Sequence, residues 1–210
     1  MKQLIYLTLL IPFISFAQRN YLDEGNKLLS QNKNMEAEEI FKEALNSEKD
    51  NLIYRTQLGL SLINQGEYIK AEKQLEKVLA KDPSNTAALW YSGINNFQNA
   101  KNFRKAVIYF EKAYPFIPKT SPQFFAVNFF IGKSYRNLLY TEGLTYEETS
   151  RMLETSNEYV RLQPNASDTD QFISFIKYVE ENRFPPNVKK WRVVNENNAD
   201  ELINKELERK

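Results

Sequence analysis

The stretch LIYRTQLGLSLINQGEYIKAEKQLEKVLAKDP, residues 52–83, decides the fold. Its first half, Leu52–Asn64, carries apolar residues at helical spacing and predicts one helix. Gln65-Gly66-Glu67 predicts a turn. Residues 68–80 predict a second helix whose apolar face is Ala71, Leu75, Val78 and Leu79. Pro83 ends that helix because proline cannot continue it.

This helix–turn–helix pattern recurs about every 34 residues along the chain. Glycines stand at intervals of 34, 34 and 39 residues, at Gly25, Gly59, Gly93 and Gly132. A matching set of small and large apolar residues follows each of the first three: Ala37/Phe41/Ala44, Ala71/Leu75/Val78 and Ala106/Phe110/Ala113. Where two helices cross, a missing side chain lets the backbones approach, and a large residue fills the space beside the contact. The repeat therefore predicts stacked helix pairs.

The composition excludes several classes of protein. The chain of 210 residues has no Cys and no His, which excludes a disulfide framework, a thiolate or imidazole metal site and a Ser-His-Asp triad. With 28 Lys and Arg against 27 Asp and Glu, it lacks the positive charge that nucleic-acid binding requires. Its 14 Phe and 12 Tyr supply ample apolar area for a core.

These motifs resemble the tetratricopeptide repeat family, whose pattern is W-x2-L-G-x2-Y, then A-x3-F, then proline. The units span about residues 18–51, 52–85, 87–120 and a degenerate 121–164. In the third unit, Gly93 sits one place early relative to Trp90 and Phe97, so two registers one residue apart are open. In the fourth unit, the alanine, phenylalanine and alanine places hold Thr149, Leu153 and Ser156. The resemblance implies an all-α, right-handed superhelical solenoid of antiparallel helix pairs.

Both ends of the chain lie outside the repeats. Residues 1–17 resemble a cleavable signal peptide, with Lys2, an apolar run and small residues before a cut after Ala17. The sequence thus predicts a periplasmic or secreted protein that has no membrane span after signal cleavage. A lipoprotein is not expected, because no cysteine follows the apolar run to carry the lipid. The alternative is an uncleaved N-terminal anchor.

At the C-terminal end, residues 165–184 predict a capping helix with one apolar stripe: Phe172, Phe175, Ile176 and Val179. Residues 185–210 follow as a tail. We expect Trp191 to pack back on the solenoid while Lys189, Lys190 and Arg192 stay in water. A short helix through Leu202, Ile203 and Leu207 either docks or frays.

The resemblance implies where a ligand binds. In the family, the first helix of each unit lines a concave groove that holds peptides. Transferred place by place, the groove residues here are Asn26, Leu29, Thr56, Leu60, Asn64, Tyr91, Asn95, Gln98, Phe129, Lys133 and Arg136. Amides can bond a peptide backbone, aromatic rings supply anchor area, and Lys133 with Arg136 could hold a carboxylate.

We therefore predict a non-catalytic adaptor or scaffold that binds a peptide or helix of another protein, within an envelope assembly. Self-association into a structural oligomer is the first alternative, and an enzyme or glycan-binding protein that uses the groove is the second. The adjacent acids Glu38-Glu39 and Glu147-Glu148 point to different sides of a helix and predict solvated faces or helix starts. No cofactor, metal or nucleic acid is expected.

Overall fold

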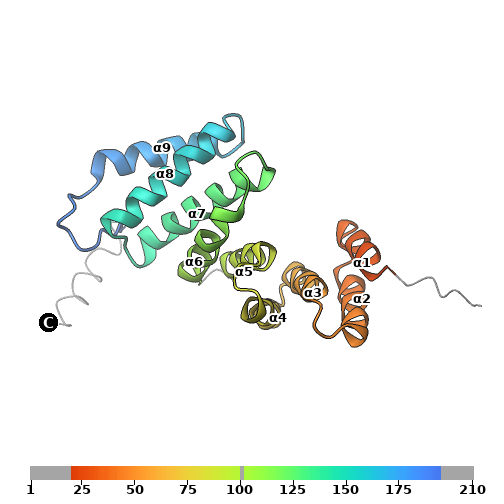
Figure 1. The fold of residues 1–210 in the computed structure, drawn as a ribbon. Helices are drawn as coiled ribbons and strands as arrows, with labels where there is room; N and C mark the ends of the chain where they lie inside the picture. Colours follow the sequence, from red (N-terminus) through yellow and green to blue (C-terminus); the bar gives the residue numbers. More distant parts are fainter. Residues whose placement is uncertain (1–19, 100–101, 195–210) are drawn as a thin grey trace, which may run out of the picture.

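The computed structural model describes residues 20–99 and 102–194, which form helices joined by short turns (Figure 1). Four antiparallel pairs follow one another: α1 (Tyr21–Ser30) with α2 (Asn34–Ser47), α3 (Leu52–Asn64) with α4 (Tyr68–Lys81), α5 (Thr86–Gln98) with α6 (Phe103–Ala113), and α7 (Pro122–Thr141) with α8 (Tyr146–Leu162). A short 3₁₀ helix, η1 (Tyr114–Phe116), extends α6, and α9 (Thr169–Asn182) covers the C-terminal end.

Each second helix also packs against the first helix of the next pair, so the core continues from one pair to the next. The predicted fold class is confirmed: the chain is an all-α, right-handed superhelical solenoid of antiparallel helix pairs with a C-terminal capping helix. The predicted signal peptide and the helix predicted through Leu202, Ile203 and Leu207 lie outside the described residues. None of the helices in the described ranges is both long and apolar enough to cross a membrane.

The two helices of a pair cross where a glycine meets a large side chain. A methyl group added to Gly59 would lie 2.8 Å from Leu75 Cδ2, and one added to Gly93 would lie 2.5 Å from the Phe110 ring. Gly25 meets the ring of Phe41 in the same way. These separations are far below ordinary carbon–carbon contact, so the close crossing depends on the missing side chain.

This contact fixes the register of the third unit. Gly93 faces Phe110 as Gly59 faces Leu75, so the glycine marks the equivalent place in α5. Four positions separate α5 from α6, whereas three separate the helices of the first two pairs, so the extra residue of this unit falls between its two helices. Of the two registers left open by the sequence, the structure adopts the one counted from Gly93, and the places counted from Trp90 and Phe97 fall one residue late.

The fourth unit also differs from the sequence alignment. Gly132 faces Ser156, and a methyl group there would lie 2.6 Å from the Ser156 hydroxyl oxygen. Ser156 rather than Leu153 thus occupies the place that Phe41, Leu75 and Phe110 hold in the earlier units. A serine is small, and α7 and α8 compensate by length, with 20 and 17 residues against 10 to 14 in the first three pairs.

The C-terminal cap is held by α9 and by the segment that follows it. The predicted stripe of α9, Phe172, Phe175, Ile176 and Val179, is buried. After α9 the chain crosses the α7–α8 turn, where Leu144 and Trp191 exchange two backbone hydrogen bonds of 2.8 Å. Trp191 is buried while Lys189, Lys190 and Arg192 are exposed, which confirms that the tryptophan packs back on the solenoid.

The crossing contact predicts the effect of one methyl group. Replacing Gly93 by Ala forces the Phe110 ring to move, and overpacking of this kind costs about 1–3 kcal/mol of unfolding free energy. Urea denaturation measures the change. A second variant that also carries Phe110→Leu has more room and should recover part of the loss. Equal stability of the wild type and Gly93→Ala would contradict the crossing argument.

Candidate peptide-binding surface

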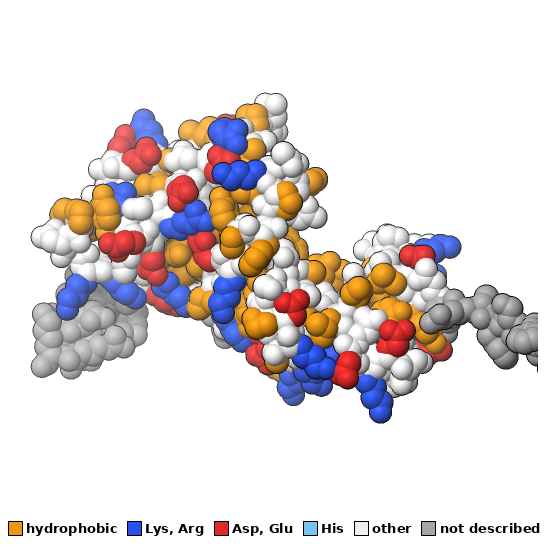
Figure 2. Space-filling model, in the orientation of Figure 1, with side chains coloured by type: hydrophobic (Ala, Val, Ile, Leu, Met, Phe, Trp, Pro, Cys, Tyr) orange, Lys and Arg blue, Asp and Glu red, His pale blue; other side chains and the backbone are white. Residues whose placement is uncertain are grey.

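The first helices α3 and α5 carry far fewer charged residues than the second helices beside them. α5 contains no charged residue, and α3 contains only Arg55, whose guanidinium donates to Gln74 Oε1 at 3.1 Å and to the Lys49 carbonyl oxygen. By contrast, α4 carries six charged side chains. Figure 2 shows the result: apolar side chains gather over the α3 to α7 region, and charged side chains line the lower edge near α4. The two middle first helices, α3 and α5, therefore present a nearly uncharged and largely apolar surface. At either side of them, α1 carries three charged residues and α7 carries Lys133 and Arg136.

Several apolar side chains of this surface are only partly covered. Ile53 of α3 is 56% exposed, although it is a large aliphatic residue. The half-buried members on α3 and α5 are Leu60, Trp90, Tyr91, Ile94 and Phe97. We refer to these six residues together with Asn26 of α1 and Lys133 of α7 as the first-helix surface. Partly exposed aromatic and aliphatic groups in a row are the usual anchors of a protein-binding face.

A pocket opens at one edge of this surface. It has a volume of about 310 Å³ and lies between the N-terminal turn of α5 and the connection that leads from α6 to α7. Its lining is Thr86, Ala87, Trp90, Tyr91, Phe116, Ile117, Pro118, Ser121 and Gln123. We call it the α5 pocket.

The residues predicted from sequence fall into three groups. Asn26, Asn64 and Gln98 are exposed, and Leu29, Leu60, Tyr91, Phe129, Lys133 and Arg136 are half-buried. Thr56 and Asn95 are buried, with 4% and 2% of their surface exposed. The prediction that the first two groups bind a partner stays a prediction. Only Tyr91 of the set lines the α5 pocket.

Thr56 and Asn95 are buried, although the sequence placed them in an exposed groove. The Thr56 hydroxyl donates to the Leu52 carbonyl oxygen of its own helix at 2.7 Å. Asn95 donates to the Tyr68 carbonyl oxygen at 3.1 Å and to Glu72 Oε2 at 2.8 Å, and it lies in the wall of a pocket of about 270 Å³ beside α4. Thr56 is thus bonded within α3, and Asn95 links α5 to α4.

The corrected register explains the error in the third unit. Counted from the glycine, the places of Phe129, Lys133 and Arg136 in α7 correspond to Trp90, Ile94 and Phe97 in α5. The aromatic places of the family motif suggested Tyr91 and Asn95, one residue later. The glycine spacing alone would have identified Trp90, Ile94 and Phe97. Phe116 gave no sequence signal, since it lies outside the repeat pattern.

At the C-terminal end, the predicted basic pair already contacts aromatic rings. Lys133 Nζ lies 4.7 Å from the centroid of the Phe129 ring, and the Arg136 guanidinium lies 4.4 Å from that of Phe175 on α9. Such contacts are cation–π interactions. They hold both cations at the surface of α7. The binding of a carboxylate by Lys133 and Arg136 stays a prediction.

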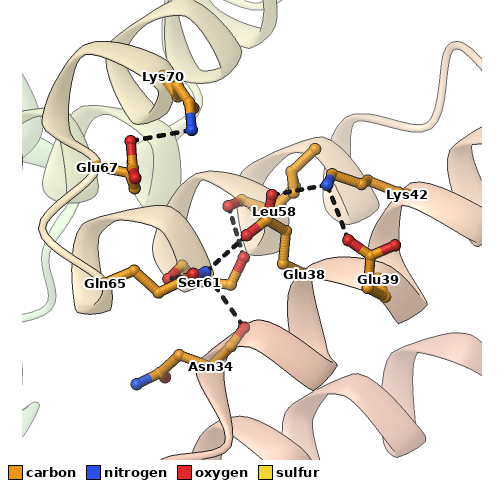
Figure 3. A network of polar contacts seen from close by, with 9 residues as sticks. All are labelled: Asn34, Glu38, Glu39, Lys42, Leu58, Ser61, Gln65, Glu67 and Lys70. Atoms are coloured by element: carbon orange, nitrogen blue, oxygen red, sulfur yellow. Dashed lines mark hydrogen bonds and ion pairs between the residues drawn. The ribbon is translucent and has the colours of Figure 1, made fainter.

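A polar link joins the first and second pairs, shown in Figure 3. Gln65, just after α3, donates to Glu38 Oε2 of α2 at 2.7 Å, and Lys42 pairs with Glu38 at 2.8 Å. Gln65 also reaches the Asn34 carbonyl oxygen at 3.4 Å. Burial raises the pKa of Glu38, but the hydrogen bonds from Lys42 and Gln65 outweigh it and leave the pKa below its usual range.

A second link is built on the equivalent acid of the next unit, 34 residues along the chain, with different donors. Glu72 takes the place of Glu38, and it accepts from Asn95 at 2.8 Å and from Asn96 at 2.9 Å. Lys105 pairs with Glu72 at 2.5 Å, and this hydrogen bond raises the pKa of Lys105. Asn95 is thus part of the bond between successive units.

The paired acids singled out in the sequence have structural partners. The Glu148 carboxylate accepts a hydrogen bond of 3.0 Å from the Thr145 backbone N–H and so caps the start of α8. It also accepts a hydrogen bond from the Arg104 guanidinium. Glu38 belongs to the link described above, and Glu39 pairs with Lys42 at the surface. Within residues 20–99 and 102–194, no three acidic side chains gather to hold a metal ion.

Comparison with known proteins supports the fold. No protein-family model matches the chain, and no curated protein does. The solved structure "MamA 41-end from Desulfovibrio magneticus RS-1" is similar with a TM-score of 0.62 and 21% identity, over 90% of this chain and 93% of that one. "Crystal structure of MamA protein" gives a TM-score of 0.60 and 18% identity, over 78% and 82%. At these identities the likeness establishes a shared helical solenoid fold.

Because Asn95 is buried and bonded to Tyr68 and Glu72, we expect its loss to lower the unfolding free energy. Asn95→Ala leaves the Tyr68 carbonyl and Glu72 short of a donor, which costs about 1–3 kcal/mol of unfolding free energy. Gln98→Ala on the same helix removes an exposed amide and should stay within about 0.5 kcal/mol of the wild type. Thermal or urea unfolding of both variants distinguishes them. A stable Asn95→Ala protein would return Asn95 to the list of candidate binding residues.

Proposed function

We propose that this protein is a non-catalytic adaptor or scaffold that binds a peptide or helix of another protein on its first-helix surface. The observation that carries the proposal is the difference in charge in the middle of the solenoid. The first helices α3 and α5 hold one charged residue between them, while the second helices α2, α4 and α6 hold five, six and four. The charged second helices are in contact with water. The apolar residues of α3 and α5 are therefore not needed for hydration and can serve as a binding surface.

The shape of the solenoid supports the same function. Stacked helix pairs place their first helices side by side, and such arrays form extended binding faces. Here α1 contacts α3, and α3 contacts α5, so their faces join into one surface. An amphipathic helix or an extended peptide can lay several apolar side chains along a surface of this kind.

We further propose that the protein acts after export, in the bacterial envelope or outside the cell. The support is the sequence of residues 1–17, which carries the three regions of a signal peptide. The mature chain would begin at Gln18.

Self-association is a second candidate, supported by apolar side chains at the C-terminal end. Ile173 and Tyr178 of α9 are 48% and 41% exposed, and Phe184 just after α9 is 48% exposed. A second copy that packed on this end would cover them.

A crosslinked capture from the native envelope tests the proposed function. The binding variant carries four alanines at equivalent places, each one residue after the unit's glycine: Asn26, Leu60, Ile94 and Lys133. The control variant carries Lys77→Ala and Lys112→Ala, exposed equivalent places on α4 and α6. Thermal melts verify that both variants fold. A protein captured by the wild type and the control, but lost with the binding variant, is the expected result.

Three other outcomes would contradict parts of the proposal. Equal capture by the binding variant would place the partner away from the first helices. Recovery of the bait alone would favour self-association. If the measured mass of the native protein showed that residues 1–17 were still present, cleavage after Ala17 would be contradicted.

A further inference from the structure

The α5 pocket lies at a connection that is twice as long as the two connections between the earlier helix pairs. Four residues separate α2 from α3, and four separate α4 from α5, but eight separate α6 from α7. The longer connection contains η1 and places Phe116, Ile117 and Pro118 opposite the first turns of α5. Trp90 and Phe97 of α5 contact Phe130 of α7, and the pocket opens beside the N-terminal turn of α5, where this connection passes.

The walls of the pocket are held firmly by the core. The Trp90 ring lies edge-on to Phe110 and to Phe130, with centroid distances of 5.5 and 5.8 Å. Ile117 is buried, with 7% of its surface exposed. The pocket is therefore formed before any ligand arrives, which lowers the entropic cost of binding.

The lining selects the chemistry of the occupant. None of the nine lining residues carries a charge, although a quarter of the whole chain is charged. Trp90, Phe116 and Ile117 form the apolar part. Thr86, Ser121 and Gln123 supply hydroxyl and amide groups. Burial raises the pKa of Tyr91, so its hydroxyl is neutral over the physiological pH range.

The size of the pocket also limits the occupant. A volume of about 310 Å³ lies at the lower end of the range of roughly 300–1,000 Å³ found for small-molecule sites. A charged group placed there would lose its hydration without gaining an ionic partner from the lining. One large apolar side chain fits both the size and the chemistry, while the hydroxyl and amide groups can bond the backbone on either side of it.

We infer that the α5 pocket binds one aromatic or large aliphatic side chain of the partner peptide. The hydroxyl and amide groups of the lining then bond the peptide groups on either side of that residue. The inference deepens the proposed function and rests on it, since the pocket supplies the anchor site of the first-helix surface. It assigns the partner a specific feature: an apolar anchor residue rather than an acidic or basic one.

A titration with single-residue probes tests this chemistry without knowledge of the partner. N-acetyl-phenylalanine amide and N-acetyl-leucine amide are added to the ¹⁵N-labelled protein, with N-acetyl-lysine amide and N-acetyl-glutamate amide as charged comparisons. The indole N–H signal of Trp90 reports on the pocket, and that of Trp191, buried in the C-terminal cap, is an internal control. We expect the Trp90 signal to shift saturably with the two apolar probes only.

Two alanine-to-glutamate variants complete the test. Ala87→Glu puts a carboxylate into the pocket lining, and Ala80→Glu puts one on α4, outside both that lining and the first-helix surface. Both residues are exposed, so neither change disturbs the core. We expect Ala87→Glu to weaken binding of the phenylalanine probe by about tenfold or more, because a charge now sits in an apolar site, and Ala80→Glu to leave it unchanged.

The outcomes separate this inference from the proposed function. An unmoved Trp90 signal, equal binding of the charged probes, or an Ala87→Glu protein that binds as the wild type does would overturn the inference. Those results would not contradict the proposed function, because the envelope capture could still identify a partner that binds elsewhere on the first helices. Conversely, binding of the apolar probes without any captured partner would support the pocket and count against the scaffold.

Discussion

The whole solenoid depends on one contact, a glycine of the first helix against a large side chain of the second. Gly25 with Phe41, Gly59 with Leu75 and Gly93 with Phe110 repeat this contact in three successive pairs. Because each helix pair closes tightly, its second helix can also pack on the next first helix, and a single core runs along the chain. The fourth pair replaces the large side chain by Ser156 and relies on longer helices and the C-terminal cap.

Tight pairing has a consequence for the surface. The glycine of the crossing occupies one side of each first helix, and the large residue comes from the second helix. The first-helix surface on α3 and α5 is apolar and almost uncharged, although Trp90, Ile94 and Phe97 also pack against the core. Links such as Glu38 with Gln65 and Glu72 with Asn95 hold the units together and lie outside that surface, so variants of the links and of the surface test different properties.

The sequence predicted the fold well because the repeat itself is the physical signal. Gly59, Ala71 and Leu75 must be small, small and large for the helices to cross, and their spacing shows directly in the chain. The binding residues were harder to place. Asn95 looks like a surface amide in sequence, and only its bonds to Tyr68 and Glu72 reveal it as buried. The α5 pocket had no local signal, since it arises where the eight-residue connection after α6 meets α5.

The central claim is that a partner binds on the first helices of the solenoid. Hydrogen–deuterium exchange of the native complex, compared with the free protein, tests it most directly. The account predicts slower exchange in α3, α5 and the connection at residues 114–121, with α4 and α6 unchanged. Protection confined to α4 and α6 would contradict it and would place the partner on the charged second helices.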